Sequence, residues 1–596
     1  MGNVPTGEGF CLQLRRPFLR YRYPLISRGT KTHFQSFPKP QTARVIAGVI
    51  PRQLNENPTS LPNDFTPATI EISNEAATGA IDQTKADIAT LIQQYKKVIE
   101  WENKCIGFDK ERPESTIHLP CHRWQALLII YKHLLNEHEQ FVYMSRMPSA
   151  SAAIRDFLRN YEMLDRMWRY GIYSPLEILR QSLPESSVHM LHFIDHVSAT
   201  LNRILVFDPA LEVILYEQLG DVTRYRMAVE RQDRKHRAGI SRYWYRKAAD
   251  RNPNIGRIQH SLAVLSHSDA LQKLFYLTKA FVCVQPLDGS RAAIDIFFNH
   301  WKGLALQRDS MATHFAVAHS VLLTNGSGER LETLTNDFMS LLPMHIQRPS
   351  SRNQHEVYIM SCNIASVLGY GTPVYPHVAD LFSKKQSSGT ANESTSAMEK
   401  EDVTNSPTGL CSQLKLNQAF QAIRLTFQTL SVLLRYSNFP NAIPGIHISL
   451  AFLWRVSFHR SVMESLEATV PWQAVTEFLN SLFSHNTAFS RIQDEKFPIG
   501  EYETAPQLRE DFLIRGQVWS QFYYPDNFFK DTSGYGVSID EMDSEEVPAN
   551  AIITPSASLP GNGTTMTTVG TGGCDFLLLI PGPRVDVSPH HQVIGI

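Results

Sequence analysis

The feature that most constrains the fold is a helical spacing of apolar residues that runs from about residue 80 to residue 283. Ile88, Leu91, Tyr95 and Val98, for example, follow one another at steps of three and four, which places them on one helix face. The same period recurs, between short polar or proline-containing breaks, over residues 122–143, 150–170, 173–182, 186–205, 209–230, 239–250, 257–266 and 268–283, and it resumes from about 415 to 530. Alternating strand patterns are scarce, so the sequence predicts an all-α protein.

Length and local composition predict several units. A chain of 596 residues exceeds what one hydrophobic core usually organises. Residues 383–413 are rich in Ser, Thr, Lys and Glu, so apolar burial there cannot offset the entropy of ordering the chain. We therefore expect a basic, mostly disordered arm (1–79), a first helical domain (80–300), a second helical domain (301–530) interrupted by a disordered insertion (383–413), and a disordered tail (531–596).

Charge is balanced over the whole chain, with 57 Lys and Arg against 58 Asp and Glu, so a nucleic-acid footprint must be local. Residues 224–257 hold eleven basic residues against three acidic ones. Such an excess can bind a phosphate backbone, although a solvated helical hairpin explains it equally well. The candidate nucleic-acid contacts are Arg231, Arg234, Lys235, Arg237, Arg246 and Lys247.

Seven cysteines are scattered singly without a C-x-x-C pair, which favours a reducing compartment, and no apolar run reaches the length of a membrane span. We expect a soluble, intracellular protein with no membrane partner. Between Glu8 and Glu56 there is no acidic residue among nine basic ones. This composition resembles that of a mitochondrial transit peptide, but nothing later in the chain suggests mitochondrial chemistry, so a disordered basic arm is favoured.

Motifs of the common enzyme classes are absent: there is no G-x-x-x-x-G-K-[ST], G-x-S-x-G or H-E-x-x-H. His189, His192 and His196 have the spacing of metal ligands on one helix, but ligands from a second element would still be needed. Such histidines more often pack and form hydrogen bonds. We therefore expect no enzymatic activity, no metal and no cofactor.

Residues 219–286 carry the spacing of a tetratricopeptide (TPR) repeat. Leu219 and Gly220 open one copy, Pro253 closes it where a helix must stop, and Pro286 closes a second copy after nearly one period. Any helical protein can show such steps by chance, so the actual residues of the segment are more informative than their spacing.

The amino-acid sequence of this segment resembles the signature of the Est-type family. This family comprises the ever-shorter-telomeres telomerase subunits and the related 14-3-3-like adaptors of nonsense-mediated mRNA decay. The resemblance rests first on LGDVTRYR (219–226), YWYRKAADRNPNIGR (243–257), SLAVL (261–265) and LFYLTKAFVCVQP (274–286). It continues, particularly toward the filamentous-fungal branch, in residues 443–459, 470–483 and 508–529. It therefore covers roughly residues 85–530, in the order of the family.

The resemblance implies a 14-3-3-like domain of TPR-like hairpins, followed by stacked antiparallel helical hairpins in an α-solenoid-like array. In the family, a groove holds a phosphoserine through an Arg-Tyr pair and a lysine. Arg224 and Tyr225 match the Arg-Tyr pair, Asp221 is placed to orient the guanidinium, and Tyr173 stands at the position of the lysine. A phosphate contact competes with the alternative that Arg224 is a structural partner of Asp221.

Function follows from the same resemblance as an expectation. The family implies a scaffold that recruits a phosphorylated partner, either a decay helicase or a telomerase component, in the nucleus, the cytoplasm or both. Direct binding of RNA or single-stranded telomeric DNA by the basic hairpin 224–257 is the alternative. The nuclease domain that ends some family members is not expected, because residues after 530 lack the required pattern of strands and helices.

Overall fold

The computed structural model describes residues 75–111, 121–266, 269–287, 298, 310–324, 326–348, 354–371, 407–482 and, apart from 522, 526 and 527, 508–529. The described residues are predominantly helical, with two isolated β-bridges and no strand among them, which confirms the predicted all-α class. No helix in these ranges has the length and apolar character needed to cross a bilayer. The predicted arm up to residue 74 and the tail from 531 lie outside the described residues.

The chain divides into two compact units, residues 1–237 and 238–596. The boundary predicted near residue 300 lies among residues outside the described part. The helices of unit 1 are α3 (Glu75–Glu111), α4 (Cys121–Arg146), α5 (Ala152–Asn160), α6 (Met163–Arg166), the π-helix η1 (Met167–Tyr173), α7 (Ser174–Gln181), α8 (Ser187–Phe207), the 3-10 turn η2 (Pro209–Leu211) and α9 (Glu212–Val229).

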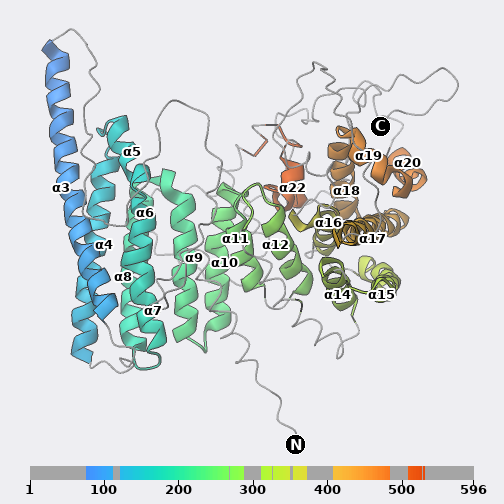
Figure 1. Cartoon of the computed structure of the whole chain (residues 1–596), viewed down its shortest axis with the longest axis horizontal. Coiled ribbons are helices and arrows are strands. Elements are labelled where there is room, and N and C mark those ends of the chain that lie inside the picture. The colour runs from blue at the N-terminus through green and yellow to red at the C-terminus, as the bar shows by residue number, and fades with distance from the viewer. Residues whose placement is uncertain are drawn as a thin grey trace, which may run out of the picture. The chain divides into compact units, whose positions relative to one another are not determined.

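The long helices of unit 1 pack side by side in the order α3, α4, α8 and α9 (Figure 1). Their facing stripes bury large side chains such as Trp124, Tyr131 and Phe141 of α4 and Phe193 of α8. Removing these apolar surfaces from water is the main force that holds the layer together. The short helix α7 packs against α8 and α9, which brings its polar face to α9.

Helix α10 (Arg234–Arg251) crosses the boundary between the units. The other helices of unit 2 are α11 (Gly256–Leu265), α12 (Ala270–Val282), α14 (Met311–Leu323), α15 (Gly328–Ile346), α16 (His355–Val367), α17 (Pro407–Arg435), α18 (Ala442–Ser457), α19 (Arg460–Leu466), α20 (Trp472–Ser481) and α22 (Arg509–Ile514), with 3-10 turns η3 (Gly369–Gly371), η5 (Glu467–Thr469) and η6 (Val518–Ser520).

Unit 2 is built from packed helical pairs. Helix α11 pairs with α12, α14 with α15, and α16 with α17, while α16 also contacts α12 and α18 (Figure 1). Helix α16 is therefore the centre of this unit, and nearly all its side chains are buried. Pro253 lies two residues after the end of α10, as its missing N–H and fixed φ predict.

The helices up to α12 and from α17 onward agree with the predicted periodic stretches except at two places, whereas α14, α15 and α16 lie between residues 311 and 367, where no periodic stretch was predicted. The stretch 150–170 is broken at Glu162, whose backbone is left-handed with φ 51°. A non-glycine residue in that conformation ends one helix and redirects the chain. Helix α17 begins at Pro407, inside the segment 383–413 that we expected to be disordered, whereas residues 383–406 lie outside the described part. Proline is well suited to this first helical position.

Candidate functional site

Helix α9 carries the LGDVTRYR segment and fixes the spacing of its polar side chains. Leu219 and Val222 are buried, which orients the helix, and Asp221 and Arg224 are one turn apart. The Arg224 Nη1 atom lies 3.8 Å from Asp221 Oδ1, and the two side chains are 21% and 10% exposed. The predicted pairing of Arg224 with Asp221 is thus present, and the guanidinium retains partial access to solvent.

Tyr225 is buried, at 4% exposure. The hydroxyl is the only polar group of its side chain. The hydroxyl donates a hydrogen bond to Glu177 Oε1 of α7 at 2.7 Å. Burial raises the pKa of Tyr225 well above its usual range, and the negative charge of Glu177 adds to this shift. The phenol is therefore a fixed hydrogen-bond donor in a water-poor environment.

Glu177 is also bound by Arg180, one turn later on α7. Arg180 Nε donates to Glu177 Oε1 at 3.0 Å, and Arg180 Nη2 donates to Oε2 at 2.7 Å. The hydrogen bonds with Glu177 raise the pKa of Arg180. Neither Glu177 nor Arg180 was predicted from the sequence as a site residue. Their signal was present in the Glu-x-x-Arg spacing of the segment SPLEILRQ, but the spacing does not reveal that this face of α7 meets Tyr225.

Tyr173, which the sequence resemblance aligned with a phosphate-binding lysine, is 7% exposed and ends the π-helix η1 immediately before α7. Its hydroxyl interacts electrostatically with both Tyr225 and Arg180. A π-turn widens the helix and is often found at functional sites. Here it sets the start of α7, which carries Glu177 and Arg180. No positive charge replaces the lysine at Tyr173.

These residues form one group, which we call the α7–α9 cluster: Tyr173, Glu177 and Arg180 from η1 and α7, and Asp221, Arg224 and Tyr225 from α9. It contains two guanidinium groups, two phenols and two carboxylates. Guanidinium groups bind phosphate or carboxylate oxygens in pairs, whereas the carboxylates hold the guanidinium groups in place and oppose another anion. The cluster thus has the chemistry of an anion site that already contains negative charge.

The six candidate nucleic-acid contacts differ in accessibility. Arg231 and Lys235 are exposed, and Arg234 is half-buried. Arg237 donates to Glu230, which also binds Arg226 of α9. These ion pairs neutralise part of the positive charge at the turn between α9 and α10.

The remaining two candidates lie further along α10. Arg246 is buried, at 9% exposure, and Lys247 is half-buried with its Nζ 4.9 Å from the centre of the Tyr243 ring. Of the six candidates, Arg231, Arg234, Lys235 and Arg237 are therefore either accessible or paired at the surface. Arg246 would have to move to reach a backbone phosphate.

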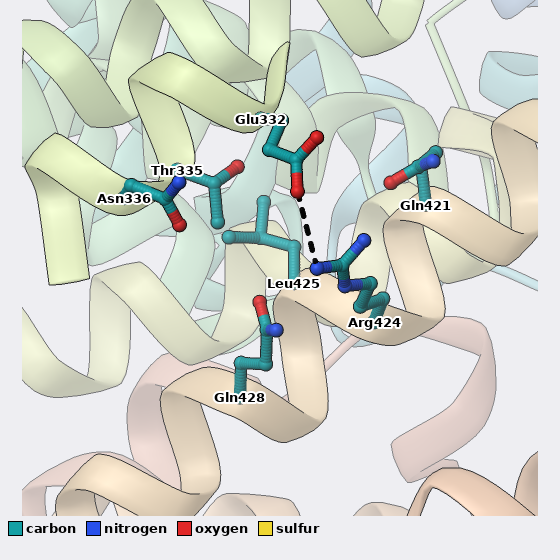
Figure 2. Close-up of a pocket in the computed structure, with 7 residues that line it drawn as sticks. All are labelled: Glu332, Thr335, Asn336, Gln421, Arg424, Leu425 and Gln428. Atoms are coloured by element: carbon teal, nitrogen blue, oxygen red, sulfur yellow. Dashed lines mark ion pairs between the residues drawn. The ribbon is translucent and has the colours of Figure 1, made fainter. Parts of the chain in front are cut away.

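A further candidate binding site is the pocket between α15 and α17, shown in Figure 2. Polar side chains surround it, Leu425 lies at its centre, and Arg424 of α17 pairs with Glu332 of α15 at 3.5 Å. The side chains of both partners are more than 40% exposed, so this ion pair contributes little to the stability of the fold. A space of about 10 Å³ admits roughly one water molecule, far less than a small-molecule site requires.

Among the residues that the structure describes, the histidines of α8 are not grouped with further metal ligands. Asp195, beside His196, receives a hydrogen bond from Arg226 at 2.6 Å, and burial lowers the pKa of His196. Within the described residues, no group of three His, Cys, Asp or Glu side chains is arranged to hold a metal ion.

Comparison with known proteins identifies no relative: no protein-family model matches the chain, and no curated protein matches it significantly.

Proposed function

We propose that this protein is a non-enzymatic adaptor of the Est type, which binds a phosphorylated protein through the α7–α9 cluster. The observation that carries the proposal is that Arg180 of α7 and Arg224 of α9, on two packed helices, are each about one fifth exposed, and that Arg180 shares Glu177 with the Tyr225 hydroxyl. A phosphoserine has close to two negative charges and three acceptor oxygens at neutral pH. Two pre-positioned guanidinium groups and a phenol suit that ligand.

The resemblance in residues 85–530 supports the pathway part of the proposal. We propose a role in nonsense-mediated mRNA decay or telomere maintenance, with a decay helicase or a telomerase component as the phosphorylated partner, in the nucleus, the cytoplasm or both. Two compact all-α units built from helical pairs suit such a scaffold, because repeated pairs present long binding surfaces.

The first test reverses the charge of Arg224. In the full-length protein, Arg224→Glu should abolish binding of a phosphoserine peptide, because it replaces a charge-assisted donor, typically worth about 1.5–3 kcal/mol, by a repulsive carboxylate. Isothermal titration calorimetry against the phosphorylated and unphosphorylated peptide measures the difference.

Arg159→Glu is the matched control, since Arg159 of α5 is 80% exposed and pairs with the exposed Asp156 on the same helix. This variant makes the same change in net charge and should bind as the parent does. Equal affinity of the parent for both peptides would contradict the proposal.

Direct binding of RNA or single-stranded telomeric DNA is the second candidate, and the exposed Arg231 and Lys235 support it. In that case, affinity for a single-stranded oligonucleotide should fall steeply with salt, and it should fall again on reversing the charges of Arg234, Lys235 and Arg237. An affinity that is independent of salt would exclude this function.

A further inference from the structure

Glu177 occupies the centre of the α7–α9 cluster as a bound anion would. Its Oε1 accepts from the Tyr225 hydroxyl at 2.7 Å and from Arg180 Nε at 3.0 Å, and its Oε2 accepts from Arg180 Nη2 at 2.7 Å. Two parallel bonds from a guanidinium fork, together with a phenol, are the contacts by which proteins commonly hold a phosphate or carboxylate. In this structure these donors are used by a carboxylate of the chain itself.

Displacement of Glu177 would require a change of its side chain only. The carboxylate is joined to α7 by a flexible side chain, and 13% of that side chain is exposed. A change between staggered rotamers moves such a group into water. The donors on Tyr225 and Arg180 would then face the incoming ligand.

We propose that Glu177 is a resident anion, which occupies the phosphate position of the α7–α9 cluster and must be displaced before a phosphorylated partner binds. The inference rests on the proposed function and adds regulation of the same site. It also assigns a selectivity. A glutamate or aspartate of a ligand offers the same single charge as Glu177 but lacks its tether, so it competes poorly, whereas a phosphate brings nearly twice the charge.

The test removes the charge of Glu177 and keeps its size. The probe is the peptide acetyl-Gly-Ala-phosphoserine-Ala-Gly-amide, with its unphosphorylated and glutamate twins, titrated into the full chain at fixed salt. Glu177→Gln should bind the phosphopeptide about tenfold more tightly than the parent and should begin to bind the glutamate twin. Asp156→Asn removes one negative charge from the surface of α5 and is the matched control, with no change expected.

The outcomes separate the two ideas. If Glu177→Gln binds the phosphopeptide no more tightly than the parent, while Arg224→Glu still abolishes binding, the resident-anion inference is overturned and the proposed function stands. If neither the parent nor Glu177→Gln distinguishes the phosphopeptide from its unphosphorylated twin, the proposed function fails and the inference fails with it. A gain as large in Asp156→Asn overturns the inference, because the effect is then one of net charge.

Discussion

At the scale of single residues, buried ions determine how this protein responds to substitution and to pH. Glu102 of α3 is 2% exposed, and Arg166 of α6 binds it through Nε at 3.1 Å and also through Nη2. Burial by itself would raise the pKa of Glu102, but the hydrogen bonds and charges of His138 and Arg166 outweigh it and lower the pKa. The carboxylate is therefore ionised within the helical layer.

Loss of Arg166 should destabilise unit 1 strongly. In Arg166→Met the Glu102 carboxylate loses its cationic partner in a buried position, which typically costs about 3–5 kcal/mol. Urea unfolding at pH 7 measures the loss, and Arg159→Met, at the exposed pair with Asp156, should cost less than about 1 kcal/mol. Similar losses in the two variants would show that the Glu102 carboxylate is not buried as described.

The pH dependence of this pair has a defined sign. In the folded protein, the pKa of Glu102 lies below its ordinary value of 4.5. The contribution of Glu102 to the free energy of unfolding is therefore complete above pH 4.5 and is lost as the pH falls through the pKa of the folded state. The difference in stability between the parent and Arg166→Met should therefore shrink below pH 4.5.

At the scale of elements, the backbone of the segment 508–520 packs against the chain around the ends of α10, α11 and α12. Val284 N donates to Gly516 O at 3.0 Å, and Gly256 N donates to Gln285 O at 2.8 Å beside it. Gly516 has φ +81°, and a Cβ atom there would lie 2.1 Å from Pro253 O. Only glycine combines this backbone conformation with so close an approach.

Gly516→Ala should therefore loosen the segment 508–520. A strained left-handed residue costs about 1–3 kcal/mol, and the clash with Pro253 O adds to this. Hydrogen exchange of the Val284 amide should become faster. Gly328→Ala is the control, because its Cβ would meet nothing within 4 Å at the start of α15, and it should leave that exchange unchanged. Unaltered exchange at Val284 in Gly516→Ala would refute this account.

At the scale of the molecule, contacts between distant parts of the chain complete unit 2. Lys279 of α12 is fully buried, and its Nζ donates to Leu513 O, 234 residues later, at 2.6 Å. The ammonium thus caps the C-terminal end of α22, where the helix dipole favours a cation. Burial, with a smaller contribution from the charge of Arg515, nevertheless lowers the pKa of Lys279 to about 8.

Stability should consequently rise with pH in a window set by Lys279. Between about pH 8 and its ordinary value of 10.5, the unfolded chain holds a proton that the folded lysine has lost, so the free energy of unfolding increases by about 3 kcal/mol in total. Below pH 8 this contribution is constant. Lys279→Met should lose the rise, whereas Lys235→Met, at an exposed site, should keep it. Parallel curves for the parent and Lys279→Met would contradict the prediction.

The sequence by itself determined the helices up to α12 and most of those from α17 onward, together with the place of the α9 residues, whereas α14 to α16 were not predicted. Apolar spacing and breakers such as Pro253 act within a few turns, so local interactions suffice to predict α4, α8 and α12. For the same reason the proximity of Arg224 to Asp221 followed from helical geometry alone.

Only the tertiary structure decided which faces meet. Glu177 reaches Tyr225 across 48 residues, and Lys279 reaches Leu513 across 234, because the packing of apolar surfaces brings their helices together. No local pattern encodes such partners. The same packing placed Arg246 inside its unit and left Arg231 in solvent, although both belong to one basic segment of the sequence. Charge can be counted along a chain, but burial and partners depend on the completed fold.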